Sequence, residues 1–465
     1  MKCILPFLVL LLPLQADEPP LVFHEPPVDL SKEAVTEDWP RFFGPRDNCT
    51  TREAPLLKSF PAGGLKKVFE LSRGESYSSP ILVDGRLLHF HAVDSHETLD
   101  CHHPETGKLI WTFRYPIEYR DRYGFAAGPR SSPVVHQDRI YLVGVTAMLH
   151  CLDLKTGKVI WKRDLAAEFK IPAYFFGYGP NPVVYGDTLV LNLGGKEKKS
   201  KGTCVAALNL IDGKTRWTYE DTWGASYASP VISKMHGQDI ALVLAAGESR
   251  PATGGLLVLN PKTGKKLARF PWRSDIYESV LASTPLPVGD DKVFICECYE
   301  LGGVLLRFDQ NFNPTIVWKK RFFGMHMMIP QRLGDYLYGF AGRNIPDTQL
   351  KAADLKTGEI LWEDDMRWKE DQRVTGLFRG SFIKAGKRLF SLGEDGSFAE
   401  LDLTPKGPVI VQKTRLFYAR DTWTPPVIHR GLLYVAQNTR GFDGTPPRLL
   451  CYDFRPFQQE TPLSK

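Results

Sequence analysis

Five of the eleven histidines fall in one short stretch, HFHAVDSHETLDCHH, which runs from His89 to His103. Alternate side chains of a strand share a face, so His89 and His91 are expected together on one strand, and Cys101 and His103 on the next. Imidazole and thiolate groups at such spacing are suitable ligands for zinc or copper. However, His89 and His103 also stand where a neighbouring repeat carries a core leucine and a turn aspartate. Ordinary structural use of these positions is therefore favoured and no metal site is predicted, with His89, His91, Cys101 and His103 as the candidate cluster if one exists.

Carboxylates form a second candidate group. Glycoside hydrolysis needs two carboxyl groups held within roughly 5–10 Å of each other. Four acidic residues are expected near the mouth of the central channel that the repeats predict: Glu75, Asp221, Glu278 and Asp421. The sequence has no Walker loop, no GxSxG elbow and no Ser, His and Asp order that indicates a triad. No catalytic residue is predicted, and a carbohydrate-active enzyme remains an alternative.

A repeat of about 50 residues positions these side chains. Its clearest part is a turn phrase that ends in Trp, such as CLDLKTGKVIW from Cys151 to Trp161. A second phrase, of the type YSSPILVDGRLLHF from Tyr77, keeps the same period and occurs eight times. Each repeat holds short apolar runs separated by turn residues, which predict strands. Four such strands form an antiparallel meander, so the sequence predicts an all-β fold, an eight-bladed β-propeller with four-stranded antiparallel blades.

The two ends of the chain are expected to close the ring. The last repeat, RLLCYDF from Arg448 to Phe454, stops before its final strand, and KKVFEL, from Lys66 to Leu71, has no partner near the N-terminus. Pairing of these N- and C-terminal strands would leave no open sheet edge.

The tryptophan of the turn phrase recurs at one repeat position, which indicates a structural role. We expect each indole to dock into the seam with a neighbouring blade. These blade-docking residues are Trp111, Trp161, Trp217, Trp318 and Trp362.

The connections on the two faces of the ring differ. Those on one face are short and uniform, whereas those on the other are long and varied, such as RYPIEYRDRYGFAAGPR from Arg114 to Arg130. Variable loops on a rigid scaffold usually carry function, and aromatic and Arg side chains are enriched at binding sites. The residues expected to rim the channel on this loop-rich face, and hence the candidate binding residues, are Tyr77, Arg130, Trp223, Tyr227, Arg379 and Trp423.

The chain divides into five expected segments. Residues 1–16 have the pattern of a secretory signal peptide, with Lys2, an apolar run and Ala16 at the cleavage position. Residues 17–38 are expected to be a Pro-rich acidic linker, 39–65 an N-terminal strap, 66–456 the propeller and 457–465 a tail. The apolar run is too short to span a bilayer. Export to the periplasm or the cell exterior is expected, without a membrane span.

Composition narrows the function classes. The net charge is +6 and no dense basic stripe is present, so no nucleic-acid partner is predicted. The cluster KEKKSK, from Lys196 to Lys201, has the composition of a solvated loop. Cys101, Cys151 and Cys451 occupy equivalent repeat positions, which indicates buried apolar residues rather than a disulfide framework.

The repeat unit resembles that of the PQQ-like eight-bladed propellers, the quinoprotein alcohol dehydrogenase superfamily. The segment DWPRFFGPRDNCT, from Asp38 to Thr50, is similar to the N-terminal signature of a family of exported bacterial PQQ-binding-like repeat proteins, which is related to lipoprotein B of the Bam complex. Resemblance to the dehydrogenases implies PQQ, Ca²⁺ with Glu and Asn ligands, a stacking Trp, an Asp base and an adjacent Cys–Cys pair. This sequence has no adjacent cysteines. No cofactor is predicted, and PQQ with Ca²⁺ is the alternative.

Together these observations predict an exported, non-catalytic binding or assembly scaffold that holds a protein or another envelope component on its loop-rich face. The alternative is an extracytoplasmic enzyme, either a divergent quinoprotein dehydrogenase or a carbohydrate-active propeller. The partner and the oligomeric state are left open.

Overall fold

The computed structural model of the chain describes residues 21–195, 202–246, 252–345, 347–370 and 372–456. The expected signal peptide, the tail 457–465 and the lysine-rich loop 196–201 lie outside these residues. Within them, no helix has the length and apolar character needed to cross a bilayer.

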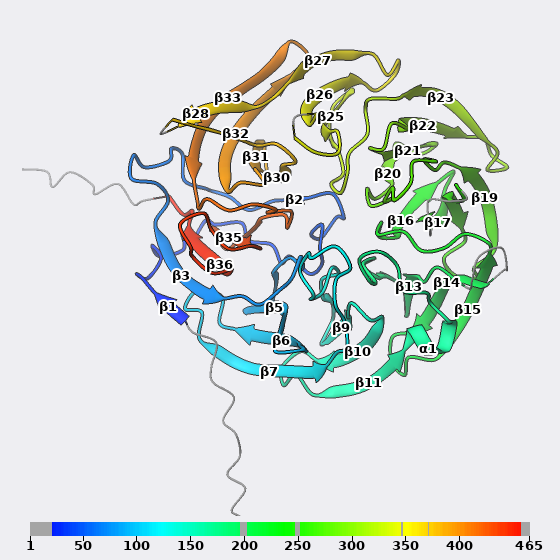
Figure 1. Ribbon diagram of the computed structural model, residues 1–465, viewed down its shortest axis with the longest axis horizontal. Helices are drawn as coiled ribbons and strands as arrows, with labels where there is room; N and C mark the ends of the chain where they lie inside the picture. Colours follow the sequence, from blue (N-terminus) through cyan, green and yellow to red (C-terminus); the bar gives the residue numbers. More distant parts are fainter. Residues whose placement is uncertain (1–20, 196–201, 247–251, 346, 371, 457–465) are drawn as a thin grey trace, which may run out of the picture.

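Eight antiparallel sheets stand around a central axis, so the predicted eight-bladed propeller is confirmed (Figure 1). Strands that follow one another in sequence are neighbours within each blade, except where strands from the N-terminus complete the last blade, and the first strand of a blade lies nearest the axis.

The strands of blades 1 to 4 are as follows. Blade 1 contains β4 (Ile81–Val83), β5 (Arg86–Val93), β6 (His96–His102) and β7 (Leu109–Pro116); blade 2 contains β8 (Val134–His136), β9 (Arg139–Val143), β10 (Met148–Asp153) and β11 (Val159–Asp164). Blade 3 contains β12 (Val183–Tyr185), β13 (Thr188–Asn192), β14 (Gly202–Asn209) and β15 (Thr215–Asp221); blade 4 contains β16 (Val231–Met235), β17 (Gln238–Ala245), β18 (Gly255–Leu259) and β19 (Lys266–Pro271). One short helix, α1 (Leu165–Phe169), follows blade 2.

Blades 5 to 8 complete the ring. Blade 5 contains β20 (Leu286–Val288), β21 (Lys292–Glu297), β22 (Gly302–Phe308) and β23 (Pro314–Lys320); blade 6 contains β24 (Gln331–Leu333), β25 (Tyr336–Ala341), β26 (Gln349–Asp354) and β27 (Ile360–Asp364). Blade 7 contains β30 (Ser381–Ala385), β31 (Arg388–Leu392), β32 (Ser397–Thr404) and β33 (Gly407–Arg415), preceded by the hairpin β28 (Arg367–Glu370) and β29 (Arg373–Gly376). Blade 8 contains β34 (Val427–His429), β35 (Leu432–Gln437), β36 (Arg448–Asp453), β3 (Lys67–Ser72) and β1 (Leu21–Phe23).

The ring closes where the two ends of the chain meet. β3 pairs antiparallel with β36, with Glu70 opposite Leu450, so the predicted closure by N- and C-terminal strands is confirmed. In Figure 1 the blue β3 lies beside the red β36. β1, from the segment expected as a linker, adds a further strand outside β3, with Leu21 opposite Leu71.

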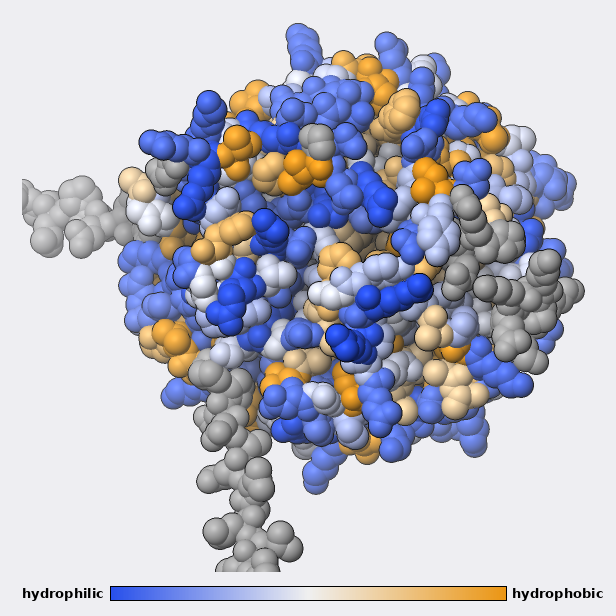
Figure 2. Space-filling model, in the orientation of Figure 1, coloured by the Kyte–Doolittle hydropathy of each residue, from blue (hydrophilic) through white to orange (hydrophobic). Residues whose placement is uncertain are grey.

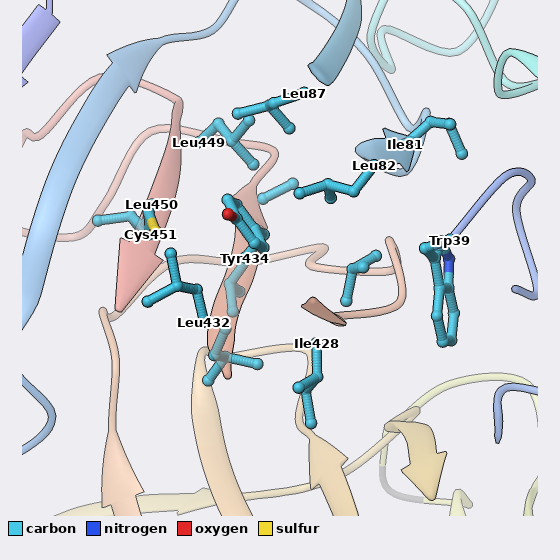
Figure 3. Packing of buried hydrophobic residues seen from close by; sticks show 14 of the residues in the cluster. Trp39, Ile81, Leu82, Leu87, Ile428, Leu432, Tyr434, Leu449, Leu450 and Cys451 are labelled. Atoms are coloured by element: carbon cyan, nitrogen blue, oxygen red, sulfur yellow. The ribbon is translucent and has the colours of Figure 1, made fainter. Parts of the chain in front are cut away.

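Burial explains the two kinds of strand. Inner strands lie between neighbouring blades and are largely buried, as in β13, which is buried along its length. Outer strands alternate half-buried and exposed residues, as in β7, because one of their faces meets solvent. Figure 3 shows part of a core cluster that joins the first and last blades, with Leu87 of blade 1 near Leu449 of blade 8.

The turn-phrase tryptophans connect five of the blades to the next blade along the chain. Trp217 Nε1 donates to Pro261 O (3.0 Å), Trp318 Nε1 to Leu355 O (2.9 Å) and Trp362 Nε1 to Thr404 O (2.8 Å), each across a seam. The indoles of Trp111, Trp161, Trp217 and Trp318 also lie against the turn glycine of the following blade. Each of these glycines has a positive φ, and its missing Cβ leaves the space that the indole occupies.

The N-terminal strap crosses the ring on the short-turn face. Trp39 exchanges two backbone hydrogen bonds with Leu82 of blade 1 (2.7 and 3.1 Å), and β2 (Thr50–Thr51) pairs parallel with β30 of blade 7. Only blade 8 lies between these two blades, so the two anchors lie in nearby blades of the ring. Between these anchors Phe43 is buried against Ile329, in the connection from blade 5 to blade 6.

Candidate functional site

A cavity of about 330 Å³ lies on the propeller axis, between the strap and the loop-rich face. Tyr123 and Phe125 come from the connection between blades 1 and 2, Phe176 from the connection between blades 2 and 3, and Trp423 from that between blades 7 and 8. Phe42 of the strap lies at the opposite end. The long connections thus supply the walls and the strap supplies the floor.

Five of the six predicted binding residues line this cavity. They come from five different blade connections, which bring together side chains that are far apart in the sequence. These five residues are Tyr77, Arg130, Tyr227, Arg379 and Trp423.

Trp223 does not line the cavity. It is buried in a core cluster shared by blades 3 and 4, and the Arg269 guanidinium lies 3.5 Å from the centre of its ring. The Asp221 carboxylate binds Arg269 (3.1 Å) and also accepts the backbone N–H of Trp223 (3.2 Å). These bonds fix the chain with the indole turned between the blades, which the repeat position alone does not reveal.

Five aromatic rings form a continuous wall in the cavity, in the order Tyr77, Trp423, Phe125, Phe176 and Tyr227. Consecutive ring centroids are 5.4, 5.8, 5.6 and 5.8 Å apart. Tilted and stacked rings at such distances stabilise one another beyond the burial of their area. The wall, which we call the aromatic wall, is therefore a rigid apolar surface.

Both predicted arginines are already paired with carboxylates. Arg130 Nη2 lies 2.7 Å from Asp121 Oδ2, and Arg379 Nε lies 2.6 Å from Glu394 Oε2. Ion pairing fixes the two guanidinium groups at the wall and neutralises their charge. They contribute oriented N–H donors rather than free cations.

A third guanidinium stands at the cavity without such a partner. Arg343 is exposed, lies 4.8 Å from the centre of the Tyr299 ring, and forms no ion pair within the residues that the structure describes. Tyr299 also hydrogen-bonds to Nε2 of the half-buried His326 (3.1 Å). Burial, followed by the charges of Arg379 and Arg343, lowers the His326 pKa to about 3, so this imidazole is neutral.

The four candidate carboxylates do not gather at the cavity. Of the four acidic candidates, only Glu278 lines the cavity, where it accepts a hydrogen bond from the Tyr123 hydroxyl (2.9 Å). Glu75, Asp221 and Asp421 do not line it, although all four were expected near the channel mouth. The described lining therefore presents one carboxylate where glycoside hydrolysis needs two.

The structure also separates the candidate metal cluster. In the register of β5 and β6, His89 lies opposite Asp100, whereas Leu88 lies opposite Cys101. Cys101 therefore belongs to the apolar core on the other face of the blade, and His103 is exposed beyond the end of β6. His89, His91, Cys101 and His103 do not form one set of ligands, because the pairing register separates them.

Sequence reasoning missed the floor and much of the wall. Phe42 and Phe43 pack edge to face with ring centroids 4.6 Å apart, and both line the cavity. Their signal is the adjacent aromatic pair in RFFGPR, within a segment expected only to strap the ring. Phe125 and Phe176 lie in long connections between blades. The sequence shows that these connections contain aromatic residues, but it does not show their conformation.

Comparison with known proteins now bears on this geometry. Residues 95–364 match the family described as outer membrane protein assembly factor BamB. The chain belongs to this family. The match extends from the hairpin of β5 and β6 to the end of blade 6. A search of curated proteins gave no match.

Solved structures share the fold of this BamB-family chain. BamB from Moraxella catarrhalis superposes with a TM-score of 0.50 at 15% identity, over 85% of this chain and 99% of that one. Quinohemoprotein alcohol dehydrogenase from Comamonas testosteroni superposes with a TM-score of 0.62 at 13% identity, over 92% and 82%. A europium-containing methanol dehydrogenase gives 0.57 at 12% identity, over 90% and 98%. The predicted resemblance is confirmed, and at these identities it shows the fold alone.

The cavity lining does not fit a calcium-bound quinone. Ca²⁺ takes about six to eight oxygen ligands, and the carboxylate and amide side chains of the described lining are Glu278, Asn181 and Asn344. The Asn181 oxygen already accepts a backbone N–H (2.6 Å), and the Asn344 oxygen lies 3.3 Å from a guanidinium nitrogen. Cys296 and Cys298 are unpaired and do not line the cavity. The absence of a cofactor stays a prediction.

Proposed function

We propose that this chain is a non-catalytic scaffold of the cell envelope that binds a partner protein by accepting an apolar segment in its axial cavity. The observation that carries this proposal is the aromatic wall. These large rings pack against one another. They present a large contact area, and their side chains lose little conformational entropy when a partner binds. A cavity of about 330 Å³ is at the lower end of the usual range for ligand pockets, which suits one or two apolar side chains of a protein segment.

The polar groups at the cavity favour the same kind of occupant. Arg130 and Arg379 are held by Asp121 and Glu394, so they can donate to backbone carbonyls without bringing uncompensated charge. Arg343 adds an exposed cation at the mouth, which would suit an acidic residue beside the apolar segment. The occupant is therefore expected to be a short apolar stretch flanked by a carboxylate.

The surface outside the cavity is the alternative place for apolar area that could bind a partner, and Figure 2 shows one face of it. On the face drawn in Figure 2, hydrophobic residues are scattered among hydrophilic ones rather than gathered in one area. Among the described residues of that view, no broad apolar area competes with the cavity as a docking surface.

Pull-down from an envelope fraction tests the proposal. The doubly substituted chain Phe125→Ala/Phe176→Ala should lose a partner that the unsubstituted chain retains. Phe442→Ala is the matched control, because Phe442 is an exposed aromatic residue of a long loop and does not line the cavity. Equal capture by all three chains would contradict the proposal.

The quinoprotein alternative is tested in the same preparation. A large, saturable rise in the melting temperature with PQQ and Ca²⁺ would show preferential binding to the folded chain. That result would overturn the scaffold proposal in favour of a divergent dehydrogenase.

A further inference from the structure

A buried polar cluster lies within blade 1, away from the axial cavity. His89, His91, Asp100 and His102 share one face of the hairpin formed by β5 and β6, and each is at most 2% exposed. Gly74, in the link from β3 to β4, donates its backbone N–H to His91. The cluster therefore adjoins the segment that enters blade 1 from the ring closure.

Hydrogen bonds fix the orientation of Asp100. Because Gly74 donates to His91 Nδ1 (2.8 Å), the His91 proton lies on Nε2, which donates to Asp100 Oδ2 (3.0 Å). The Thr112 hydroxyl donates to Asp100 Oδ1 (2.6 Å). Burial acts to raise the pKa of Asp100, but the bond and charge of His91, with Thr112, outweigh it and hold this pKa below its ordinary value. Asp100 is thus a fixed carboxylate.

His102 has the tautomer of a metal ligand. Its Nδ1 lies 2.9 Å from Gly107 O, and a carbonyl can only accept, so Nδ1 carries the proton. Nε2 then holds a free lone pair, and it has no hydrogen-bond partner within the described residues. A histidine that donates one ring N–H to a backbone carbonyl and keeps the other nitrogen free is the usual arrangement of metal-binding histidines.

His89 lacks any partner that would account for its burial. Neither ring nitrogen bonds to another group among the residues described, although the side chain is 1% exposed and stacks on His91 at 4.3 Å. Burying unbonded polar atoms is unfavourable. Burial, then His91 and Arg73, lowers the pKa of His89 well below its ordinary value, so its lone pair is available.

We propose that His89, Asp100 and His102 bind one divalent transition-metal ion, for which zinc is the reference, as a structural site of blade 1. The ligand atoms of these three residues all lie within 4.8 Å of one another. Two imidazole nitrogens and one carboxylate oxygen are an ordinary ligand set for zinc. His91 and the Gly107 carbonyl orient the ligands. The charge of the buried Arg73 opposes the cation and limits the affinity.

Zinc loading on refolding tests the site, because a buried cluster is filled most readily as the chain folds. The full chain, refolded with zinc and then freed of excess metal, should retain one zinc ion and melt at a higher temperature than the chain refolded with chelator. His89→Gln and His102→Gln should retain none. His91→Gln should lower the affinity by about 10–100-fold. His150→Gln is the control, since His150 is a buried imidazole of blade 2 outside the cluster.

Two results would overturn the proposal. One is a correctly refolded chain without zinc; the other is equal zinc retention by the unsubstituted chain and both ligand variants. Cobalt loading of the unsubstituted chain gives a test that does not depend on the folding of variants. We expect visible cobalt bands without a thiolate-to-cobalt band, whereas a thiolate band would assign a cysteine such as Cys101 and contradict the proposed ligands.

Discussion

The Arg379 guanidinium lies 4.6 Å from the centre of the Trp423 ring, and both side chains bond to the same oxygen of Glu394. Arg379 Nε donates at 2.6 Å and Trp423 Nε1 at 2.9 Å. The Trp423 ring also stacks on Tyr77, with centroids 5.4 Å apart. The indole is therefore held in the cavity wall before any partner binds, which lowers the entropic cost of binding.

Trp423→Ala should weaken partner binding by about 2–4 kcal/mol, the effect of removing a hot-spot aromatic residue. Calorimetric titration of the purified chain with the captured partner measures this change. Phe442→Ala, which removes an aromatic side chain that is 52% exposed outside the cavity, should leave the affinity unchanged. Equal affinities for the two variants would place the binding surface elsewhere.

Trp161→Ala should lower the free energy of unfolding by about 3–5 kcal/mol, since it removes a large side chain from a seam between blades. The indole lies against Gly213, and its Nε1 donates to Leu210 O (3.2 Å). Trp161→Phe retains a packed ring and loses the hydrogen bond, so it should cost about 1 kcal/mol. Denaturant unfolding measures both, and a cost for Trp161→Ala no greater than that for Trp161→Phe would contradict the docking role.

Gly213→Ala tests the same seam from the other side. A Cβ at Gly213 would lie 2.8 Å from the Trp161 ring, whereas a Cβ at Gly85 would meet no atom within 4 Å. The two glycines have similar φ angles, 70° and 66°, so backbone strain is matched. Overpacking costs about 1–3 kcal/mol, and Gly213→Ala should be more destabilising than Gly85→Ala by that amount in denaturant unfolding. Equal costs would mean that the indole does not need the glycine.

Glu97 should make stability depend on pH. Its carboxyl is fully buried and accepts hydrogen bonds from the Tyr115 hydroxyl (2.5 Å) and the Val145 backbone (2.8 Å). Burial raises the pKa of Glu97 from 4.5 to about 7, against the lowering effects of these two bonds and of Arg130. The folded chain therefore holds this proton more tightly than the unfolded chain.

The stability that protonated Glu97 contributes is complete below pH 4.5 and is lost as the pH rises through about 7. The loss should approach about 3 kcal/mol. Glu97→Gln has no such titration. The free energy of unfolding of this variant, relative to that of the unsubstituted chain, should therefore increase from about pH 5 to pH 8. Urea unfolding at both pH values measures the difference. A difference that does not change with pH would show that Glu97 titrates normally.

The fold could be predicted because its information is local and repeated. The turn phrase around Gly157 and Trp161 contains both the turn glycine and the tryptophan that contacts the next blade. The phrase also recurs along the chain. Ring closure followed from an unpaired strand at each end. The position of each blade connection relative to the axis followed from the strand order, so most of the predicted rim residues line the cavity.

The remaining details depend on contacts that no repeat encodes. Trp223 occupies an expected rim position, but the hydrogen bonds that Asp221 accepts from the Trp223 backbone and from Arg269 hold the indole between blades. The strand register places Asp100, not Cys101, opposite His89. Because neighbouring residues of a strand point to opposite faces, this shift of one residue puts Cys101 and His89 on different faces of the blade. The strap places Phe42 at the axial cavity through non-local pairing with blades 1 and 7, which the sequence of the strap alone does not show.

Site-specific photo-cross-linking tests the central claim, that the axial cavity holds a segment of a partner protein. A benzophenone amino acid would replace Phe176 in the aromatic wall, and in a second chain Ile211, a turn residue on the short-turn face that is 65% exposed. We predict one cross-linked partner at position 176, attached through an apolar peptide flanked by an acidic residue, and none at position 211. Cross-linking at position 211 but not at 176 would contradict the claim.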